Sequence, residues 1–489
     1  MGGNYEKQMF NQLEKALLRI DQLERKVQKI EDETANKYLK IIYEKEAEIA
    51  RLKEDNTILK EKVAKLEEEI ERLRKQLDNN SSNSSTPPSK DTKPNAPNTY
   101  NGRTKTGRKS GGQKGHKGYY LDKSKIEEKI QKGEVEHLIV NHGKCTDRFT
   151  SKYVVDVRIT TTATEHRFYA DDSGEISIPI EFRPDVQYGN NLKTFTTTLI
   201  GYGIVASDRV VEIIKALSDN LLSPSEGSLY NFLAEFNNKA TDKIETIKTN
   251  LLNGPVMGVD ETGSRCENRN MYFRNYSNDK YVLYTVNPTK GKKAIENDNI
   301  LTRYIGKLIH DHDTANYSYG SGNGECNVHI IRYLIANVDN THNTWSEEMI
   351  DLLLSIKISK EIAISFGMTA FEQADIDDYI KRYNKIVDAG YEGNKNNKSR
   401  FYKKEEKRLL NRLKKYRDNH LLFATDFIVP FDNNLSERDL RIVKTKTKVS
   451  GGFRSLAGAK TFANIMSITK TAIKQKLSPC RSIQAVFEG

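Results

Sequence analysis

The sequence has few cysteines, and none of them is paired at a spacing typical of a disulfide framework or a zinc finger. The four are Cys145, Cys266, Cys326 and Cys480. Without a Cys-x-x-Cys pair, a reducing compartment fits the chain better than an oxidising one. No apolar run approaches the roughly 18–20 residues that a membrane span requires, and the first residues lack the apolar core of a signal peptide. We therefore expect a cytoplasmic protein that makes no membrane contact.

Length and charge narrow the class further. The 489 residues exceed the roughly 250–300 at which a single core stops growing, so several domains are expected. Lysine and arginine number 78 against 67 acidic residues, a formal net charge of +11. Such a surplus favours a polyanionic partner, but a basic protein without one has the same composition. The position of the charge along the chain has to decide between the two.

Residues 1–79 are predicted to form a coiled coil. Residues 8–78 contain neither proline nor glycine, and leucines recur every seven residues at Leu52, Leu59, Leu66 and Leu73. A second series with the same spacing is Ile49, Asn56, Val63, Ile70 and Leu77. This pattern, with one asparagine in the second series, is typical of a parallel two-stranded coiled coil. An earlier series ending at Ile30 is out of phase, so we expect a skip or break before Tyr38. A single solvated helix is the alternative.

Residues 80–120 form a predicted disordered basic linker, because serine, asparagine, proline and glycine dominate them. Six cations and no acid lie between Gly102 and Gly118: Arg103, Lys105, Arg108, Lys109, Lys114 and Lys117. A flexible basic strand of this kind suits a phosphate backbone or a minor groove. The alternative is an ordinary solvated linker.

Two further segments precede the chemical core. Residues 121–186 are predicted to form a small β-rich element, because apolar and polar residues alternate over 154–170. Residues 187–250 are predicted to be helical, with two helices around a tight turn near 223–227. This order is compatible with a DNA-binding helix-turn-helix, although a helical pair that serves only packing has the same pattern.

The core is predicted to begin at residue 251. Three strands are expected over 254–286, with a hairpin turn at 277–280, then a helix over about 292–304 and a strand at 307–310. Asp260 ends the first strand and Asp311 follows the last. Strand, hairpin, helix, strand is the opening order of a ribonuclease-H-like α/β core, whose first and fourth strands are neighbours. We therefore expect the two carboxylates to lie close together.

Glu437 is the best candidate for a third acid. It lies near the predicted start of a helix that Asn434 or Ser436 would cap. Helical spacing puts Arg441 and Lys444 on the same face as Glu437. These two cations, with Lys448 and Arg454, are the predicted contacts with DNA phosphates in this segment. The face would then offer both a metal ligand and charges for a DNA backbone.

Three carboxylates indicate metal chemistry, because magnesium prefers oxygen ligands. Two such ions, about 3.5–4 Å apart, can activate an attacking oxygen and stabilise a leaving one in phosphodiester chemistry. Without metal the carboxylates repel, so we expect a partly open, metal-dependent site. Asp313 competes with Asp311 for the second position. Glu261 adjoins Asp260, but on a strand it would point to the opposite face.

Several segments together resemble the transposases of the IS66 family of bacterial insertion sequences, within the DDE superfamily. They are residues 83–91, 107–118, 259–262, 310–317, 325–332 and 432–455. The resemblance implies catalytic and metal-binding roles for Asp260, Asp311 and Glu437. The stretch between the last two acids is too long for one crossover. We therefore expect a ribonuclease-H-like core in 251–332 and 425–475, a helical insertion at 333–424, and a C-terminal tail at 476–489.

The resemblance also bears on possible zinc. Cys326, His329 and Arg332 match the family's Cys-x-x-His-x-x-Arg block and are predicted to support the acidic site. A buried cysteine and a hydrogen-bonded histidine without such a role are the alternative. With no second Cys/His pair nearby, a zinc site has little support. Only His142 and Cys145 remain where family members often carry a zinc-ribbon-like element, so we read that element as having lost its metal.

The predicted function is therefore metal-dependent DNA cleavage at transposon ends, followed by attack of the freed 3′ hydroxyl on target DNA. The expected cofactor is Mg²⁺, with Mn²⁺ able to substitute, and no zinc. The expected partners are transposon-end and target DNA, a second copy of the chain through the coiled coil, and accessory proteins of the same element. The alternatives are an inactive DNA-binding derivative and a nuclease without strand transfer.

Overall fold

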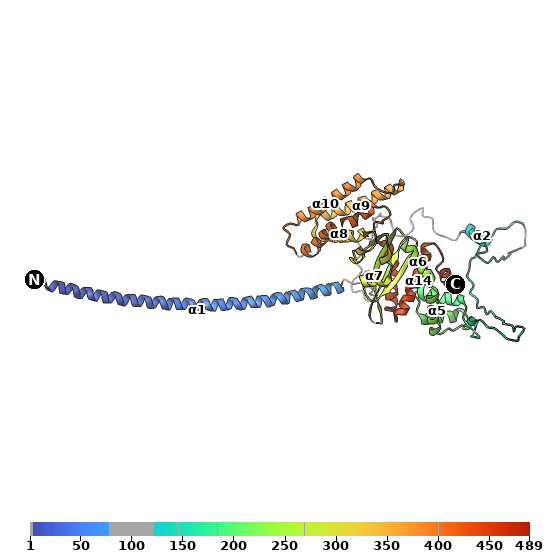
Figure 1. Ribbon diagram of the computed structural model, residues 1–489, viewed down its shortest axis with the longest axis horizontal. Helices are drawn as coiled ribbons and strands as arrows, with labels where there is room; N and C mark the ends of the chain where they lie inside the picture. The colour runs from blue at the N-terminus through green and yellow to red at the C-terminus, as the bar shows by residue number, and fades with distance from the viewer. Residues whose placement is uncertain (1–2, 78–121, 144–146, 183, 268, 400) are drawn as a thin grey trace. The chain divides into compact units, whose positions relative to one another are not determined.

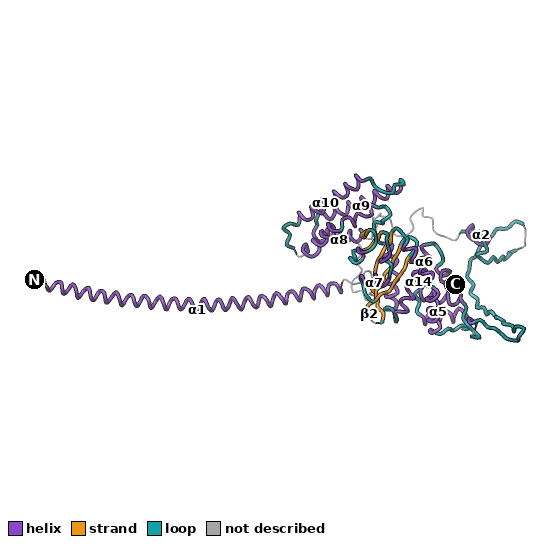
Figure 2. The backbone as a smooth tube through the Cα atoms, viewed as in Figure 1, coloured by secondary structure: helices purple, strands orange, loops and turns teal. Residues whose placement is uncertain are grey.

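The computed structural model describes residues 3–77, 122–143, 147–182, 184–267, 269–399 and 401–489 (Figure 1). The chain divides into two compact units, residues 1–83 and residues 84–489. The first unit is helical, and the second combines one five-stranded sheet with many helices (Figure 2). Within the ranges described, no helix is both long enough and apolar enough to cross a membrane.

The first unit contains one helix, α1 (Gly3–Leu77), of 75 residues. The predicted long helix is thereby confirmed. The helix continues without interruption through residues 30–38, where a skip or break was expected. A shift of heptad phase moves the apolar stripe around a helix without breaking its hydrogen bonds, so the backbone need not record it. In the single chain the stripe is exposed, with Leu52 at 60% and Leu59 at 58%.

The β-rich element predicted for residues 121–186 is not observed in the described part of that segment. The segment begins with α2 (Lys123–Gln131), whose first turn is capped by the Asp122 carboxylate accepting from the Ser124 N–H at 3.1 Å. No strand forms in residues 132–143, 147–182 or 184–189. Alternation gives the segment apolar side chains, but nothing buries them, since Val154 is 95% and Val157 82% exposed. A strand also needs a neighbour for its backbone N–H and C=O groups.

The predicted helical region is helical throughout most of its length. Ser225 caps one helix by accepting from the Ser228 N–H at 3.1 Å. A small core around Val210 and Leu229 joins α4 to α5. The elements are α3 (Asn190–Thr197), a π-helical turn (Thr198–Tyr202), α4 (Ser207–Leu217), α5 (Glu226–Lys239) and α6 (Thr241–Leu252).

The five strands lie in the order β3-β2-β1-β4-β5. Antiparallel pairing joins β1 to β2 and β2 to β3, whereas β4 pairs parallel with β1 and β5 parallel with β4. The predicted hairpin and the pairing of the first and fourth strands are confirmed; β5 was not predicted. The strands are β1 (Val256–Cys266), β2 (Arg269–Ser277), β3 (Val282–Asn287), β4 (Lys307–His310) and β5 (Gly322–Glu325).

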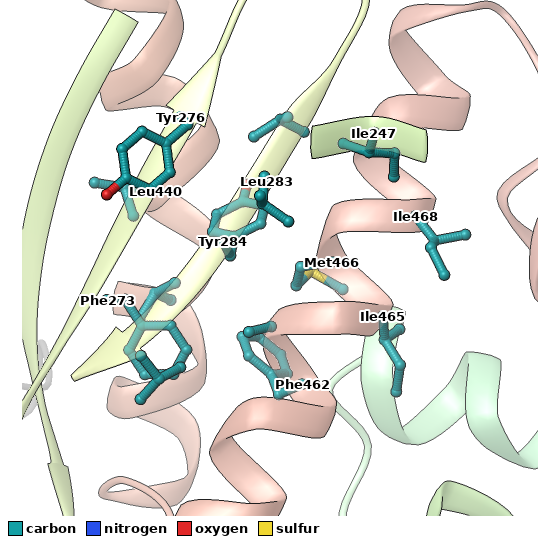
Figure 3. Close-up of a cluster of buried hydrophobic side chains, with 14 of the residues drawn as sticks. Ile247, Phe273, Tyr276, Leu283, Tyr284, Leu440, Phe462, Ile465, Met466 and Ile468 are labelled. Atoms are coloured by element: carbon teal, nitrogen blue, oxygen red, sulfur yellow. The ribbon is translucent and has the colours of Figure 1, made fainter. Parts of the chain in front are cut away.

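The main core forms where C-terminal helices pack against the sheet (Figure 3). Phe462 and Met466 on α14 (Leu456–Lys474) meet Phe273 and Tyr284 from the strands. Hydroxyl groups of α14 also accept backbone N–H groups of the edge strand β3: Thr471 from Val282 at 3.1 Å and Ser467 from Tyr284 at 2.9 Å. The helix therefore covers an edge that would otherwise present unpaired donors.

The segment expected to be a tail forms a packed helix, α15 (Pro479–Glu488). Its Ile483, Val486 and Phe487 follow the spacing of one helical face and are almost fully buried. That face packs against α14 and α3. Burial of these three side chains explains why the chain does not end in an extended tail.

Helices fill most of the stretch between Asp311 and Glu437 and have a core of their own. Tyr383 and Leu410 are fully buried there, and the Trp345 indole donates to the buried Glu406 carboxylate at 2.9 Å. These helices are α8 (Asn327–Thr341), α9 (Thr344–Ser365), α10 (Gln373–Gly393), a π-helical turn (Tyr402–Glu406), α11 (Lys407–Lys415) and α12 (Arg417–Thr425). A short α7 (Lys292–Asp298) lies earlier, between β3 and β4.

Helix α13 (Asn434–Ser450) sits so close to β1 that position 258 has no room for a side chain. A Cβ atom on Gly258 would lie 2.3 Å from Ser436 Oγ and 2.8 Å from Asn433 Oδ1. The Asn433 amide donates to the Val259 carbonyl at 2.8 Å, and the Asn275 amide donates to the Ser436 carbonyl at 3.0 Å. The start of α13 is thus fixed to two strands at once.

The other end of α13 is also tied to β1. Gly451 ends the helix with φ 73°, and the Phe453 N–H donates to the Arg265 carbonyl at 2.7 Å. Gly452 has φ +142°, and a Cβ atom there would lie 2.4 Å from the Arg265 carbonyl oxygen. Two glycines therefore permit the turn that returns the chain to β1.

We predict that Gly258→Ala destabilises the second unit, because the added methyl group meets the buried Ser436 and Asn433 side chains. Overpacking of this kind costs about 1–3 kcal/mol, measured as a lower midpoint of urea unfolding. Gly263→Ala, on the same strand as Gly258, is the matched control, since a Cβ atom there would lie 3.9 Å from the Tyr272 ring of β2, an ordinary contact distance. Equal midpoints for the two variants would contradict the proposed contact.

Candidate active site

Asp260 and Asp311 come together because their strands are parallel neighbours. Val259 pairs with His310, so Asp260 and Asp311 lie side by side where β4 ends. The first strand was expected to end at Asp260, but β1 continues to Cys266, because β2 pairs with it over that whole stretch. Burial and the carboxylates of Asp311 and Glu437 raise the pKa of Asp260 to about 7, while a hydrogen bond from the Glu261 N–H and the charge of Lys444 oppose the rise. Asp260 therefore lies within electrostatic reach of both other acids.

Glu437 enters the site from the first turn of α13, near the positive end of the helix. Burial and Asp311 raise the pKa of its carboxyl, whereas His329 and Arg332 oppose the rise. Neither Asn434 nor Ser436, the predicted caps, occupies the N-cap position of α13. The helix starts after Asn433, and the Ser436 hydroxyl instead pairs with the Ser277 hydroxyl at 3.0 Å, because that side chain faces the sheet.

His329 lies between two of the acids. Its Nδ1 is 3.0 Å from Asp311 Oδ1 and 3.6 Å from Glu437 Oε1. On the other side of the ring, Nη1 of Arg332 is 3.1 Å from Nε2. Burial disfavours charge on the ring, whereas Asp311 and Cys326 favour it and raise the pKa; the guanidinium of Arg332 against Nε2 works in the opposite direction. A guanidinium can only donate, so a proton on Nε2 would face another donor. We therefore assign the neutral form with its proton on Nδ1.

Cys326 lies at the start of α8 beside His329 and is 1% exposed. Its Sγ accepts from the Asn433 N–H at 3.3 Å, and its own N–H donates to the His310 carbonyl at 3.0 Å. Burial raises the pKa of the thiol, while His329 opposes that rise. The structure thus places the predicted supporting residues Cys326, His329 and Arg332 directly beside the acids.

The site has the character of a cation site. Within the portion of the chain described, Asp311 Oδ1, Glu437 Oε1 and His329 Nδ1 are enclosed atoms that lack a well-aligned hydrogen bond. Buried polar atoms in proteins are nearly always paired. Two carboxylate oxygens with spare lone pairs, next to an acid whose pKa is raised by its neighbours, therefore fit a divalent cation.

The two competing acids take other roles. Asp313 accepts from the Ala315 N–H at 3.1 Å and so closes a turn after β4. Glu261 pairs with the buried Arg274 at 2.8 Å and with Lys290 at 3.3 Å. Alternation along β1 directs Glu261 to this separate partner set, as expected from the sequence.

Glu325 is a further residue at the site whose partners the sequence did not reveal. It ends β5, and its side chain is fully buried. One oxygen contacts His312 Nδ1 at 2.8 Å and accepts from the Tyr317 hydroxyl; the other accepts from Arg412 Nε at 3.0 Å. Although burial opposes it, hydrogen bonds from His312 and His420 hold the pKa of Glu325 well below its usual range, helped by the charge of Arg412. Glu325 thereby joins the helical insertion to the loop that carries Asp311.

The predicted DNA contacts divide between described and undescribed residues. On α13, Arg441 is exposed and Lys444 half-buried near Asp260, while Lys448 is half-buried and Arg454 exposed beyond the helix end. Arg438, which was not among the predicted contacts, is also exposed on α13 next to Glu437. The six cations of the linker lie outside the described residues.

Two family models match the chain. The model described as Transposase IS66 family matches residues 208–461, which include all three acids. A model described as a family of unknown function, DUF6444, matches residues 31–121. A comparison with curated proteins finds no match.

We predict that Asp260→Asn stabilises the metal-free protein at pH 8 and does so less than half as much at pH 5. The folded state raises the pKa of this carboxyl from 3.8 to about 7, so it retains a proton that the unfolded chain releases. The resulting stabilisation is complete below about pH 4 and is lost as pH rises through about 7. At about 1.36 kcal/mol per unit, the upper limit is roughly 4 kcal/mol.

Urea unfolding with a chelator present at the two pH values measures this difference. Asp339→Asn, on an exposed part of α8, removes the same charge away from the site and serves as the control. An Asp260→Asn variant whose stability tracks the wild type across the pH range would show that the carboxyl does not carry the predicted repulsion.

Proposed function

Because the matched model spans more than half of it, the chain belongs to the IS66 family of transposases, and we propose that it cuts DNA at transposon ends and joins the freed 3′ hydroxyl to target DNA. The observation that carries this proposal is the convergence of three carboxylates from separate elements. Asp260 ends a run of core residues in β1, Asp311 follows β4, and Glu437 lies in the first turn of α13. Residues so far apart in the sequence meet only through the fold.

The proposed fold of the catalytic core is ribonuclease-H-like. A three-stranded antiparallel unit followed by two parallel strands, with β4 beside β1, supports this assignment. The helical segment expected at residues 333–424 would then form an insertion between the second and third acids. The proposed mechanism depends on this arrangement, because it places one acid on β1, one directly after β4 and the third on a helix that can be fixed separately.

The proposed cofactor is Mg²⁺, with Mn²⁺ able to substitute, held by Asp260, Asp311 and Glu437. A pair of such ions supplies activation of the attacking oxygen and stabilisation of the leaving oxygen. The protein's own groups orient the reactants. Lys444 lies close enough to Asp260 to oppose the rise in its pKa. A cation at that distance from the acids is also well placed to contact a DNA phosphate. Arg441, one turn away, extends the same basic face.

We propose that His329 and Arg332 position Asp311. Arg332 fixes the ring so that the Nδ1 proton faces Asp311, which keeps one carboxylate oxygen in place and leaves the other available. Outer partners of this kind orient metal ligands in many proteins. Cys326 supports the arrangement by linking the start of α8 to Asn433, the residue before α13.

DNA would be held by cations on several elements. The basic face of α13, the linker cations and the α4–α5 helical pair, read as a helix-turn-helix, are the proposed contacts. The proposed coiled coil of α1 joins two chains, one for each transposon end. The exposed leucines of α1 support a second helix as their partner. Accessory proteins of the same element would complete the assembly.

We predict that Asp260→Asn abolishes metal-dependent cleavage and strand transfer on transposon-end DNA, while a gel shift still detects DNA binding. Glu437→Gln should behave in the same way, because each variant removes one charged ligand. Loss of at least about a thousandfold in rate is expected, as for other groups that stabilise the transition state. Product analysis distinguishes joined strands from simple cleavage.

Asp313→Asn is the matched control for this test, because its side chain only closes a turn and an amide oxygen can also accept from Ala315. Retained strand transfer in Asp260→Asn would refute the catalytic assignment. Cleavage without any joined product in the wild type would favour a nuclease, and binding without cleavage would favour an inactive derivative.

We predict that replacing Leu52 and Leu59 together by glutamate dissociates the assembly, because two charges per chain would enter the apolar seam. Sedimentation analysis should then give the mass of a single chain. The control places the same charges off the seam, with Ala50→Glu and Thr57→Glu two residues before each leucine. If both double variants keep the wild-type mass, α1 does not hold the chains together.

A further inference from the structure

Four side chains at the acidic site offer a mixed set of oxygen, nitrogen and sulfur donors, whereas magnesium prefers oxygen alone. A carboxylate oxygen of Asp311, the Cys326 thiol, a ring nitrogen of His329 and a carboxylate oxygen of Glu437 all lie within 4.8 Å of one another. They come from the end of β4, the start of α8 and the first turn of α13. The set is therefore built by three elements that are packed together.

The size of this cluster is close to that of a tetrahedral metal site. Ligands bound to zinc at ~2.0–2.3 Å lie roughly 3.3–3.8 Å apart. A largest separation of 4.8 Å thus requires the donors to approach by about 1 Å. Rotation of the two carboxylates, which are only partly buried, can supply that movement.

Three of these donor atoms are also buried without a hydrogen-bond partner among the described residues. In the part of the chain that the structure describes, Asp311 Oδ1, His329 Nδ1 and Glu437 Oε1 are shielded from solvent without a well-aligned hydrogen bond. Three enclosed acceptors or donors at one place are unusual in a folded protein. His329 Nδ1 and Asp311 Oδ1 lie 3.0 Å apart but are poorly aligned, so neither atom satisfies the other.

We propose that Asp311, Cys326, His329 and Glu437 bind one transition-metal ion of the zinc and cobalt class. Thiolate and imidazole ligands select such ions, whereas magnesium prefers oxygen. The N-terminal end of α8 favours the thiolate of Cys326, and the Asn433 N–H already points at its sulfur. Binding at Nδ1 leaves the ring proton on Nε2, so the Arg332 guanidinium has to turn away from the ring.

This ion would inhibit the enzyme, because it takes Asp311 and Glu437 from the catalytic cations. Zinc is then a competitor of the Mg²⁺ cofactor and supplies nothing to the reaction. The binding step depends on the four donors alone, whereas its effect on DNA cleavage rests on the proposed function. The two parts can therefore fail separately.

Cobalt titration of the full-length chain tests the binding step, because Co²⁺ reports its ligands by absorption. We expect one Co²⁺ per chain with a sulfur-to-metal charge-transfer band and the intense visible bands of tetrahedral cobalt, all removed by added Zn²⁺. Cys326→Ser should lose the charge-transfer band and bind Zn²⁺ at least about 100-fold more weakly, since even outer partners of a metal ligand contribute about 10–100-fold.

Cys266→Ser is the matched control, because Cys266 is equally buried at the end of β1 but is not part of the cluster. It should keep the band and the affinity. His329→Gln is a second variant that should weaken Zn²⁺ binding even if Cys326→Ser does not fold, which circular dichroism would reveal. A charge-transfer band that survives Cys326→Ser, or a wild-type chain that binds no Co²⁺, overturns the site.

DNA cleavage at fixed Mg²⁺ tests the competition. Added Zn²⁺ should inhibit the wild-type chain, and His329→Gln or Cys326→Ser should need at least about 10-fold more Zn²⁺ for the same fractional loss, following their weaker binding. Cleavage that is insensitive to bound Zn²⁺ overturns the competition. Cobalt binding in a chain that never cleaves DNA keeps the metal site and refutes the proposed function.

Discussion

The seating of α13 on β1 is the contact on which the acidic site depends. Position 258 must be glycine because Ser436 and Asn433 occupy the space of its side chain. The same asparagine donates to the Val259 carbonyl, one residue before Asp260. Glu437 follows Ser436 directly, so the contact that fixes the helix also sets the height of the third acid above the sheet. Neither strand pairing nor the insertion can place Glu437 without it.

This seating brings like charges together, and the surrounding groups reduce the resulting repulsion. Asp260 responds with a pKa of about 7, so without metal it holds a proton near neutral pH. His329 directs a proton between Asp311 and Glu437, and Lys444 adds a positive charge from the helix that carries Glu437. The remaining repulsion between the carboxylates favours the binding of a cation. A hard ion suits the three acids, and a softer one suits the side that contains Cys326.

The sequence predicted the local elements of this site well. Asp260 follows the apolar start of β1, Asp311 follows the short apolar strand β4, and Glu437 lies in the first turn of a helix. Strand order alone was enough to predict the pairing of β1 with β4 and the proximity of Asp260 and Asp311. Two features were not accessible. The alternating residues 154–170 lack a neighbour that buries them, and alternation cannot reveal a missing partner. Two partners of Glu325, Arg412 and His420, lie on α11 and α12, and nothing in local spacing connects this glutamate to residues so far along the chain.

Glu325 gives the insertion a role beyond filling the gap between Asp311 and Glu437. Its oxygens are shared between Arg412 and His420 of the insertion and His312 and Tyr317 of the loop after β4. Removing Arg412 would take the guanidinium from this buried carboxylate, and breaking a buried ion pair in this way typically costs about 3–5 kcal/mol. The loop beside Asp311 and the helices of the insertion are therefore held by the same charge. Helix α8, which leads into the insertion, also reaches Asp311 directly through His329 at 3.0 Å, and α13 brings Glu437 to the same ring from the other side.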